Sequence, residues 1–263
     1  MKISVRASMA PGSRLAEKLS ALTELGYDGI ELHGDVLELS DDELARHFAG
    51  SPVQPSAMVG SLQLLNPTAA VRQEGLAEMR ARLATAKRLG AAGVIIVPTF
   101  ATRPELPNLW PLTDPLKLQW DLLVAELKLI APDYEAAGIP ILIEPLNRYE
   151  THFINRLEQG CRMCDEVGSA GCKIMADFFH MNIEEPDIAA SIRAAKAHLA
   201  YIHVADSIRL QPGTGHLDLR PGFRALKDIG YDGWLGLECG LTEPKDAALR
   251  EALELVKREW EAA

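Results

Sequence analysis

The segments ILIEPLN (141–147), KIMADF (173–178), AYIHVAD (200–206) and WLGLECG (234–240) decide the fold. Each is a short apolar run rich in strand-forming residues, and successive runs begin about 30 residues apart, the length of one strand-and-helix unit. Amphipathic segments with apolar residues at i, i+3 and i+4 separate them. This alternation predicts a parallel sheet that is buried on both faces.

The same alternation covers the rest of the chain. Further candidate strands are at 2–8, 29–34, 53–59 and 93–99, and helical patterns such as EGLAEMRARLATAKRLG (74–90) end in glycine, as helices often do. Eight such units within about 250 residues favour a closed barrel over an open doubly wound sheet, and no G-x-G-x-x-G opens a helix. We expect an α/β fold, a single (β/α)8 TIM barrel that takes in residues 1–263.

The composition and charge of the chain indicate which kinds of molecule it binds. The 263 residues are 48% hydrophobic and 24% charged, which is typical of one sizeable globular domain. The formal charge of −10 argues against a surface that binds nucleic acid, so a small-molecule substrate is expected. No apolar run approaches the roughly 18 residues of a membrane span, and MKISVRASMAPGSR (1–14) lacks the apolar stretch of a secretory signal. We therefore expect a cytoplasmic location without membrane contact.

The cysteines give only a weak signal for a metal site. Cys161 and Cys164 have C-x-x-C spacing, and Cys172 follows shortly after. A zinc site needs a fourth ligand at suitable spacing. The segment NRLEQGCRMCDEV (155–167) is better interpreted as an amphipathic helix whose thiols are small buried residues.

Four of the strands carry a potential metal ligand near their carboxyl ends, where the active site of such a barrel lies. These residues are Glu144, Asp177, His203 and Glu238. Each interrupts a run that is otherwise apolar, and an unpaired buried carboxylate has a large desolvation cost. A shared divalent cation would compensate for that cost, and mainly oxygen ligands suit Mn²⁺, Mg²⁺ or Co²⁺. The alternative is a set of separate ion pairs with lysine and arginine.

The sequence resembles the D-tagatose 3-epimerase family, or ketose 3-epimerases, within the xylose-isomerase-like barrel superfamily. The segments that carry the resemblance are IEPLNRYETHFIN (143–155), DFFHMNIEE (177–185), HVADSIRLQPGTGHLD (203–218) and GYDGWLGLE (230–238). They look like signature blocks of that family, in order and at similar separations. The N-terminal half fits the fold, with ELGYDGIEL (24–32) typical of the second strand, but has less family-specific sequence.

The resemblance implies roles for residues at the matching positions. Glu144, Asp177, His203 and Glu238 match the ligands of one divalent metal ion, with Mn²⁺ expected first. Glu144 and Glu238 also match the paired acid/base residues. A homodimer or homotetramer is expected by analogy with the family.

Three further positions match residues that hold the keto end of the substrate. They are Glu150, His180 and Arg209. Without the surrounding motifs, His180 would be interpreted as a packed histidine and Arg209 as a solvated loop arginine. His216 and Asp218, in PGTGHLD (212–218), are interpreted as structuring their loop. The remaining histidines match no motif and are assigned to structural or surface positions: His33, His47, His152 and His198.

The part of the site that would contact the far end of the substrate departs from the family. Family members use aromatic side chains after the first and third strands, whereas this chain has SMAPGS (8–13) and VGSLQLLNPTAA (59–70). Trp110, in the proline-rich segment 99–115, is the candidate aromatic wall, and the same segment is a candidate lid. A keto-acid such as a 5-ketogluconate is therefore as credible a substrate as a free ketohexose.

The expected activity is metal-dependent epimerisation at the carbinol carbon next to the carbonyl, through a cis-enediolate. Inversion requires two groups on opposed faces, so Glu144 and Glu238 alternate as acid and base. An aldose–ketose isomerase of the hydroxypyruvate type would use similar ligands, and a dehydratase or lyase is a weaker alternative. A non-catalytic sugar-binding barrel and a multi-zinc endonuclease are further alternatives, the latter disfavoured by seven scattered histidines and the negative charge.

Overall fold

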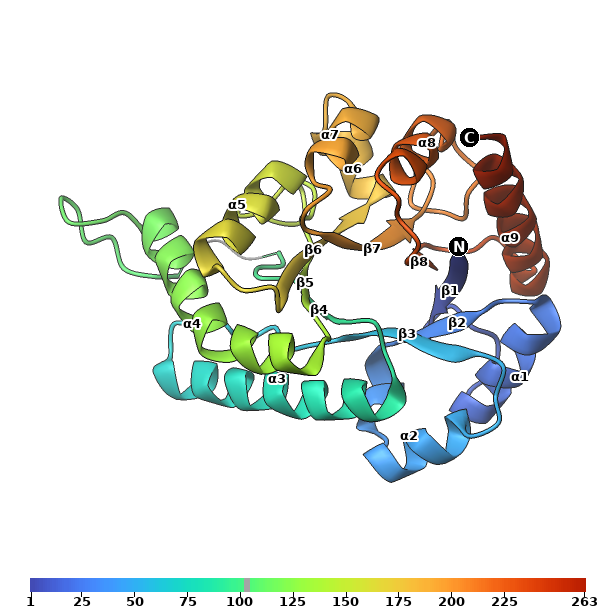
Figure 1. The fold of residues 1–263 in the computed structure, drawn as a ribbon, viewed down its shortest axis with the longest axis horizontal. Coiled ribbons are helices and arrows are strands. Elements are labelled where there is room, and N and C mark those ends of the chain that lie inside the picture. The colour runs from blue at the N-terminus through green and yellow to red at the C-terminus, as the bar shows by residue number, and fades with distance from the viewer. Residues whose placement is uncertain (102–104) are drawn as a thin grey trace.

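Eight parallel strands close into a barrel in the order of the sequence (Figure 1). The structure is a computed structural model and describes residues 1–101 and 105–263. The strands are β1 (Lys2–Arg6), β2 (Gly29–Leu32), β3 (Gln54–Val59), β4 (Val94–Ile96), β5 (Ile141–Ile143), β6 (Cys172–Asp177), β7 (Leu199–Val204) and β8 (Trp234–Leu237). β1 pairs with β8, which closes the ring and confirms the predicted (β/α)8 barrel.

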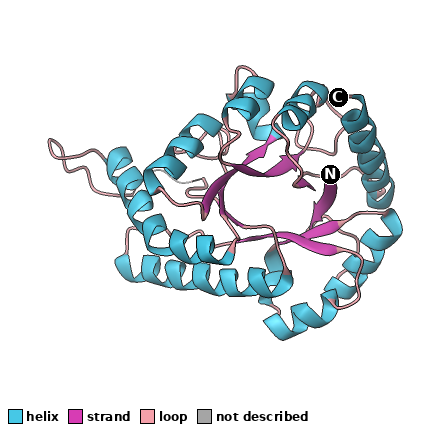
Figure 2. Cartoon of the chain, in the orientation of Figure 1, coloured by secondary structure: helices cyan, strands magenta, loops and turns pink. Residues whose placement is uncertain are grey.

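The helices form an outer ring around the strands (Figure 2). They are α1 (Leu15–Leu25), α2 (Asp41–Phe48), α3 (Ala69–Leu89), α4 (Pro115–Ala137), α5 (Leu157–Val167), α6 (Phe178–Glu184), α7 (Ile188–Ala194), α8 (Arg220–Asp228) and α9 (Lys245–Ala262), with the 3-10 turn η1 (Gly34–Glu38) after β2. The predicted glycine stops are real, since Gly90 and Gly138 follow α3 and α4 with φ of 74° and 68°. At the other end of α4, Asp114 accepts the Lys117 N–H.

Several strands are shorter than their apolar runs. β4 and β5 each comprise three residues, whereas the sequence predicts strands over 93–99 and 141–147. Pro98 and Pro145 lie just beyond these strands, and proline has no N–H to continue the ladder. As a result Glu144 is the first residue after β5, and Glu238 is the first after β8. Asp177 ends β6, and His203 lies inside β7.

Side chains from six strands pack together in one cluster inside the barrel. They are Ala57, Ile95, Leu142, Met175, Tyr201 and Trp234. The hydroxyl of Tyr201 lies 3.2 Å from Oγ of Ser4 and 2.9 Å from Oγ of Ser56, so hydroxyls from three strands meet inside the ring. A second, larger core lies between the strands and the helices.

This interior cluster determines which side chains reach the site. Side chains two apart on a strand share a face, so the residue two positions after an inward-facing one also points inward. Leu142, Met175 and Tyr201 are thereby followed by Glu144, Asp177 and His203 at the carboxyl end of the barrel. By the same rule, Arg6 on β1 points inward, because it follows the inward-facing Ser4 by two residues.

The cysteine-containing segment forms the helix that the sequence predicts. Cys164 is buried on α5 and its Sγ lies 3.7 Å from Sγ of Cys172, while Cys161 is half-buried. All these thiols are free. Within the described residues, the helices are too short or too polar to cross a bilayer.

Candidate active site

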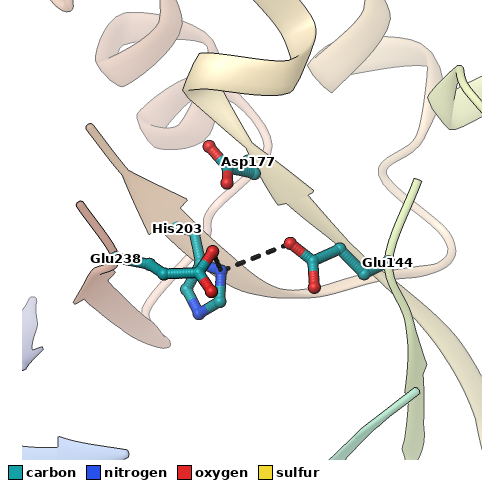
Figure 3. Close-up of side chains that lie close together, drawn as sticks. All are labelled: Glu144, Asp177, His203 and Glu238. Carbon is teal, nitrogen blue, oxygen red and sulfur yellow. Dashed lines mark ion pairs between the residues drawn. The ribbon is translucent and has the colours of Figure 1, made fainter. Parts of the chain in front are cut away.

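Four side chains from consecutive strands converge at the carboxyl end of the barrel (Figure 3). Glu144, Asp177, His203 and Glu238 each offer one ligand atom, and these atoms lie within 4.8 Å of one another. All four residues are at least 93% buried. Figure 3 shows Glu144 and Glu238 reaching toward the imidazole of His203 from opposite sides. The sequence-predicted ligands are therefore brought together.

The donor atoms of this group fit a hard divalent cation. Oε1 of Glu144, Oδ2 of Asp177 and Nδ1 of His203 are buried and have no hydrogen-bond partner among the described residues. Buried polar atoms are normally paired, so three orphaned atoms aimed at one point indicate a shared ligand. Three carboxylates and an imidazole match the oxygen-rich sets that hold Mn²⁺ or Mg²⁺.

Glu31 of β2 orients His203. Nε2 of His203 lies 2.6 Å from Oε2 of Glu31, which turns Nδ1 toward Glu144 and Glu238, at 3.5 and 3.2 Å. Burial alone would lower the pKa of His203, but Glu31 and Glu144 raise it well above its ordinary value. Of these two carboxylates, Glu144 also belongs to the group that could hold a cation. A carboxylate behind a ligating histidine fixes its ring orientation and strengthens it as a ligand.

A second group of side chains lies beside the four ligands. Nη1 of Arg209 donates to Oε1 of Glu150 at 3.0 Å and lies 3.2 Å from Nε2 of His180. Its Nη2 donates to Oε2 of Glu238 at 3.2 Å. Asn147 completes the group, because its Nδ2 lies 2.9 Å from Glu150 and 2.8 Å from Nδ1 of His180. The three residues predicted to hold the keto end are thus in one network.

The loop after β7 is built to present Arg209. Arg209 has a φ of 57°, in the left-handed region that favours glycine, and such backbone strain is concentrated at functional sites. Asp206 organises the loop, since its carboxylate accepts the N–H groups of Ser207, Gly213 and Leu217. Burial would raise the pKa of Asp206, but the backbone N–H groups of Gly215 and of these three residues lower it.

His216 and Asp218 lie in the same loop and have structural partners. The N–H of His216 donates to Oγ of Ser207, and the carboxylate of Asp218 accepts the N–H of Arg220 at the start of α8. This agrees with their predicted role in structuring the loop.

A cavity of about 440 Å³ opens above the ligands. Besides Glu144, Glu150, His203, Arg209 and Glu238, its wall includes residues that the sequence did not indicate, namely Arg6, Glu31 and His33. Leu62 and Phe100, from the segments 59–70 and 99–115, also line it. His33 thus lies in the wall of the cavity, which its assignment to a structural or surface position does not indicate. His33 lies two residues after the inward-facing Glu31, and this alternation is the signal that would have identified it.

The other motif-free histidines agree with their predicted positions. His47 is exposed on α2. Nε2 of His152 lies 3.0 Å from the side chain of Gln119, and Nε2 of His198 lies 2.8 Å from that of Asp165.

The predicted aromatic wall lies apart from the cavity. Residues 105–114 project from the rim of the barrel at the left of Figure 1, and Trp110 among them is 80% exposed. Phe100 lines the cavity in its place. Residues 102–104 of the predicted lid lie outside the described residues.

Comparisons with known proteins agree with the fold and the site. The chain is 29% identical over 259 residues to 3-dehydro-D-guloside 4-epimerase of Escherichia coli (strain K12), covering 96% of this chain and 98% of that protein. It is 30% identical over 231 residues to D-psicose 3-epimerase of Agrobacterium fabrum, covering 84% and 77%. The crystal structure of 3-keto-D-glucoside 4-epimerase from E. coli has a TM-score of 0.88 at 26% identity, covering 98% of this chain and 99% of that one.

These relatives are named as epimerases, which confirms the prediction of a carbohydrate isomerase and the resemblance to ketose 3-epimerases. The family model described as xylose isomerase-like TIM barrel matches residues 19–259. The chain belongs to the xylose isomerase-like TIM barrel family.

Proposed function

We propose that the protein is a metal-dependent epimerase that inverts the carbinol carbon next to the carbonyl of a ketose or a keto-hexonate. One observation carries the proposal: Glu144 and Glu238 reach from opposite walls to a common point, beside two further potential ligands. Epimerisation needs one group to remove a proton from one face and another to return a proton to the opposite face. The relatives named as epimerases support the same reaction type.

Glu144, Asp177, His203 and Glu238 are the residues that would hold the metal ion, since their ligand atoms converge and three are orphaned. A divalent cation bound there supplies Lewis-acid stabilisation of the negative charge that develops on the substrate oxygens. Mn²⁺ is our first choice, with Mg²⁺ and Co²⁺ as alternatives.

The proton transfers fall to the two glutamates. In one direction Glu144 takes the proton from the carbon next to the carbonyl and Glu238 delivers one to the other face, and the reverse reaction exchanges the roles. Glu150, His180 and Arg209 hold the oxygens at the keto end, because their network lies beside Glu238. Trp110 acts on substrate only if its segment moves, since it is 80% exposed.

We further propose that residues 1–263 act as one cytoplasmic domain and that the chain assembles as a homodimer or homotetramer. The continuous ring from β1 to β8 supports a single domain. Sedimentation equilibrium measures the assembly, and a monomer at micromolar concentration would contradict it.

The decisive experiment is solvent exchange. The metal-stripped and Mn²⁺-reloaded protein is incubated in D₂O with ketohexoses, ketopentoses and 5-keto-hexonates, and NMR follows deuterium and stereochemistry. Metal-dependent deuterium at the carbon next to the carbonyl, with inversion, is the expected result. Deuterium at C1 with an aldose product would instead identify an aldose–ketose isomerase. No exchange on any substrate would overturn the proposal.

A further inference from the structure

Two nitrogen-bearing side chains from β1 and its neighbour β2 line the cavity next to Glu238. Arg6 ends β1 and is paired in register with Glu31 of β2, and His33 follows Glu31 by two residues. Both therefore point into the barrel on the same wall. Arg6 and His33 also line an adjoining cavity of about 290 Å³ that contains Ser8 and Cys239. The two cavities share Arg6, His33, Arg209 and Glu238, so this wall borders both of them.

The guanidinium of Arg6 has unused hydrogen-bonding capacity. It forms an ion pair with Oε1 of Glu238, and its Nε lies 3.6 Å from Oε1 of Glu31. The Arg6 side chain is only 19% exposed. Its Nε is buried and has no hydrogen-bond partner among the described residues. A guanidinium carries five N–H donors in a planar fork. One nitrogen of this fork is paired with Glu238, and Nε has no acceptor.

The neighbouring carboxylates have other partners. Glu31 lies 2.6 Å from Nε2 of His203, and Glu150 accepts from Arg209. Glu238 belongs to the group of metal ligands. Glu238 is thus shared between Arg6, Arg209 and the candidate metal site, and the part of the Arg6 fork that does not contact Glu238 is available to a ligand in the cavity.

His33 provides a second polar group at the same place. Its Nδ1 is buried and without a hydrogen-bond partner among the described residues. Burial and the positive charge of Arg6 lower the pKa of His33, so the ring is neutral at pH 7 and offers one N–H donor. A charged fork and a neutral donor on one wall match the oxygens of a carboxylate, which arginine binds in bidentate fashion.

We propose that Arg6 and His33 form a subsite for a carboxylate at the end of the substrate remote from the keto group. The inference rests on the proposed function for the position of the keto end, at Glu150, His180 and Arg209. It names the substrate class as a keto-hexonate, in preference to an uncharged ketose.

The test uses a pair of non-reacting probes. D-Gluconate and D-glucitol have the same carbon chain and differ at C1, where one has a carboxylate and the other a hydroxymethyl group. Their binding to the Mn²⁺-loaded enzyme is measured by isothermal titration calorimetry. We expect gluconate to bind about 100-fold more tightly than glucitol, the scale of a buried charge-assisted pair.

Variants assign that preference to the subsite. Arg6→Gln should reduce gluconate affinity about 100-fold and leave glucitol affinity within about threefold, because glucitol has no carboxylate and the lost ion pair with Glu238 affects both probes alike. His33→Gln should reduce gluconate affinity about 5-fold, as for the loss of one neutral hydrogen bond. Arg6→Lys keeps the charge and should recover part of the loss. Arg193→Gln, which removes an arginine paired with Asp228 on the outside of the barrel, should change neither affinity.

Each contrary result has a distinct meaning. If gluconate keeps its advantage in Arg6→Gln and His33→Gln, the carboxylate binds elsewhere, for example on the metal, and the subsite is wrong. Equal binding of both probes by the wild type also overturns it. Because neither probe reacts, Arg6-dependent gluconate binding in a protein that exchanges no substrate proton would refute the epimerase and keep the subsite. Epimerisation without Arg6-dependent gluconate binding would refute the subsite and keep the epimerase.

Discussion

The two halves of the barrel place different chemistry at the same rim. β5 to β8 lead into Glu144, Asp177, His203 and Glu238, whose ligand atoms converge within 4.8 Å. β1 to β4 contribute Arg6, His33 and apolar residues such as Val59 and Val97 to the cavity. Because the same inward-facing alternation leads to both sets, the fold does not dictate the difference. We infer that the second half fixes the reaction and the first half fixes which substrate fits.

The largest expected effect is the loss of proton exchange when a glutamate of the second half is replaced. Glu144→Gln and Glu238→Gln each remove one of the two groups that we propose as acid and base, so proton exchange at the carbon next to the carbonyl should fall about 10²- to 10⁴-fold. The measurement is deuterium incorporation from D₂O at saturating Mn²⁺. Glu158→Gln, an exposed carboxylate of α5, is the matched control and should exchange normally. Retained epimerisation in either active-site variant would contradict the two-base assignment.

Mn²⁺ should stabilise the wild type more than a variant that lacks one of the candidate metal ligands. Mn²⁺ at 100 times its Kd should raise the free energy of unfolding by about 2.7 kcal/mol, because the assembled ligands exist only in the folded barrel. Thermal unfolding with Mn²⁺ and with a chelator measures the effect as a rise in Tm. Asp177→Asn should lose most of it, whereas Asp121→Asn on α4 should not. An identical Tm with and without Mn²⁺ would refute the site.

Glu31 tests whether the halves act independently, since it lies on β2 but bonds to His203 on β7. Glu31→Gln should weaken Mn²⁺ binding about 10- to 100-fold, as for the loss of a carboxylate behind a ligating histidine. Titration with Mn²⁺ followed by electron paramagnetic resonance gives the Kd. Glu38→Gln, exposed on η1, is the control. An unchanged Kd would show that His203 needs no support from the first half.

The smallest expected effect concerns the apolar wall of the first half. Leu62 lines the cavity but is 56% exposed, so Leu62→Ala should raise KM about 5-fold and leave kcat unchanged. Steady-state kinetics on the best substrate separates the two constants. Leu129→Ala, 60% exposed on α4, should alter neither. A fall in kcat would place Leu62 closer to the reacting atoms than the division of the halves implies.

The sequence predicts the second half of the site better than the first. A carboxylate or imidazole in an otherwise apolar strand is conspicuous, and this signal identified Glu144, Asp177, His203 and Glu238, which the structure brings together. The strand count is also recoverable, because each buried run is separated from the next by a helical period.

Arg6, Glu31 and His33 were missed for a physical reason. Arginine and histidine near a strand end are usually solvated, and only the register of β1 against β2 shows that these side chains face inward together. Trp110 illustrates the converse problem. Composition identified an aromatic residue in a long loop, but the path of that loop follows from packing that no periodicity encodes.

The pairing of β1 with β8 has a consequence for how the protein is made. Lys2–Val5 lie against Trp234–Leu237, so the ring closes between the first and the last strand to leave the ribosome. Glu238 directly follows that last strand. The four residues of the candidate metal site are therefore not all present in a nascent chain until Glu238 has been added. The candidate metal site is complete only once β8 lies beside β7 and β1, and its contact with β1 joins the two strands of the barrel that are most distant in the sequence.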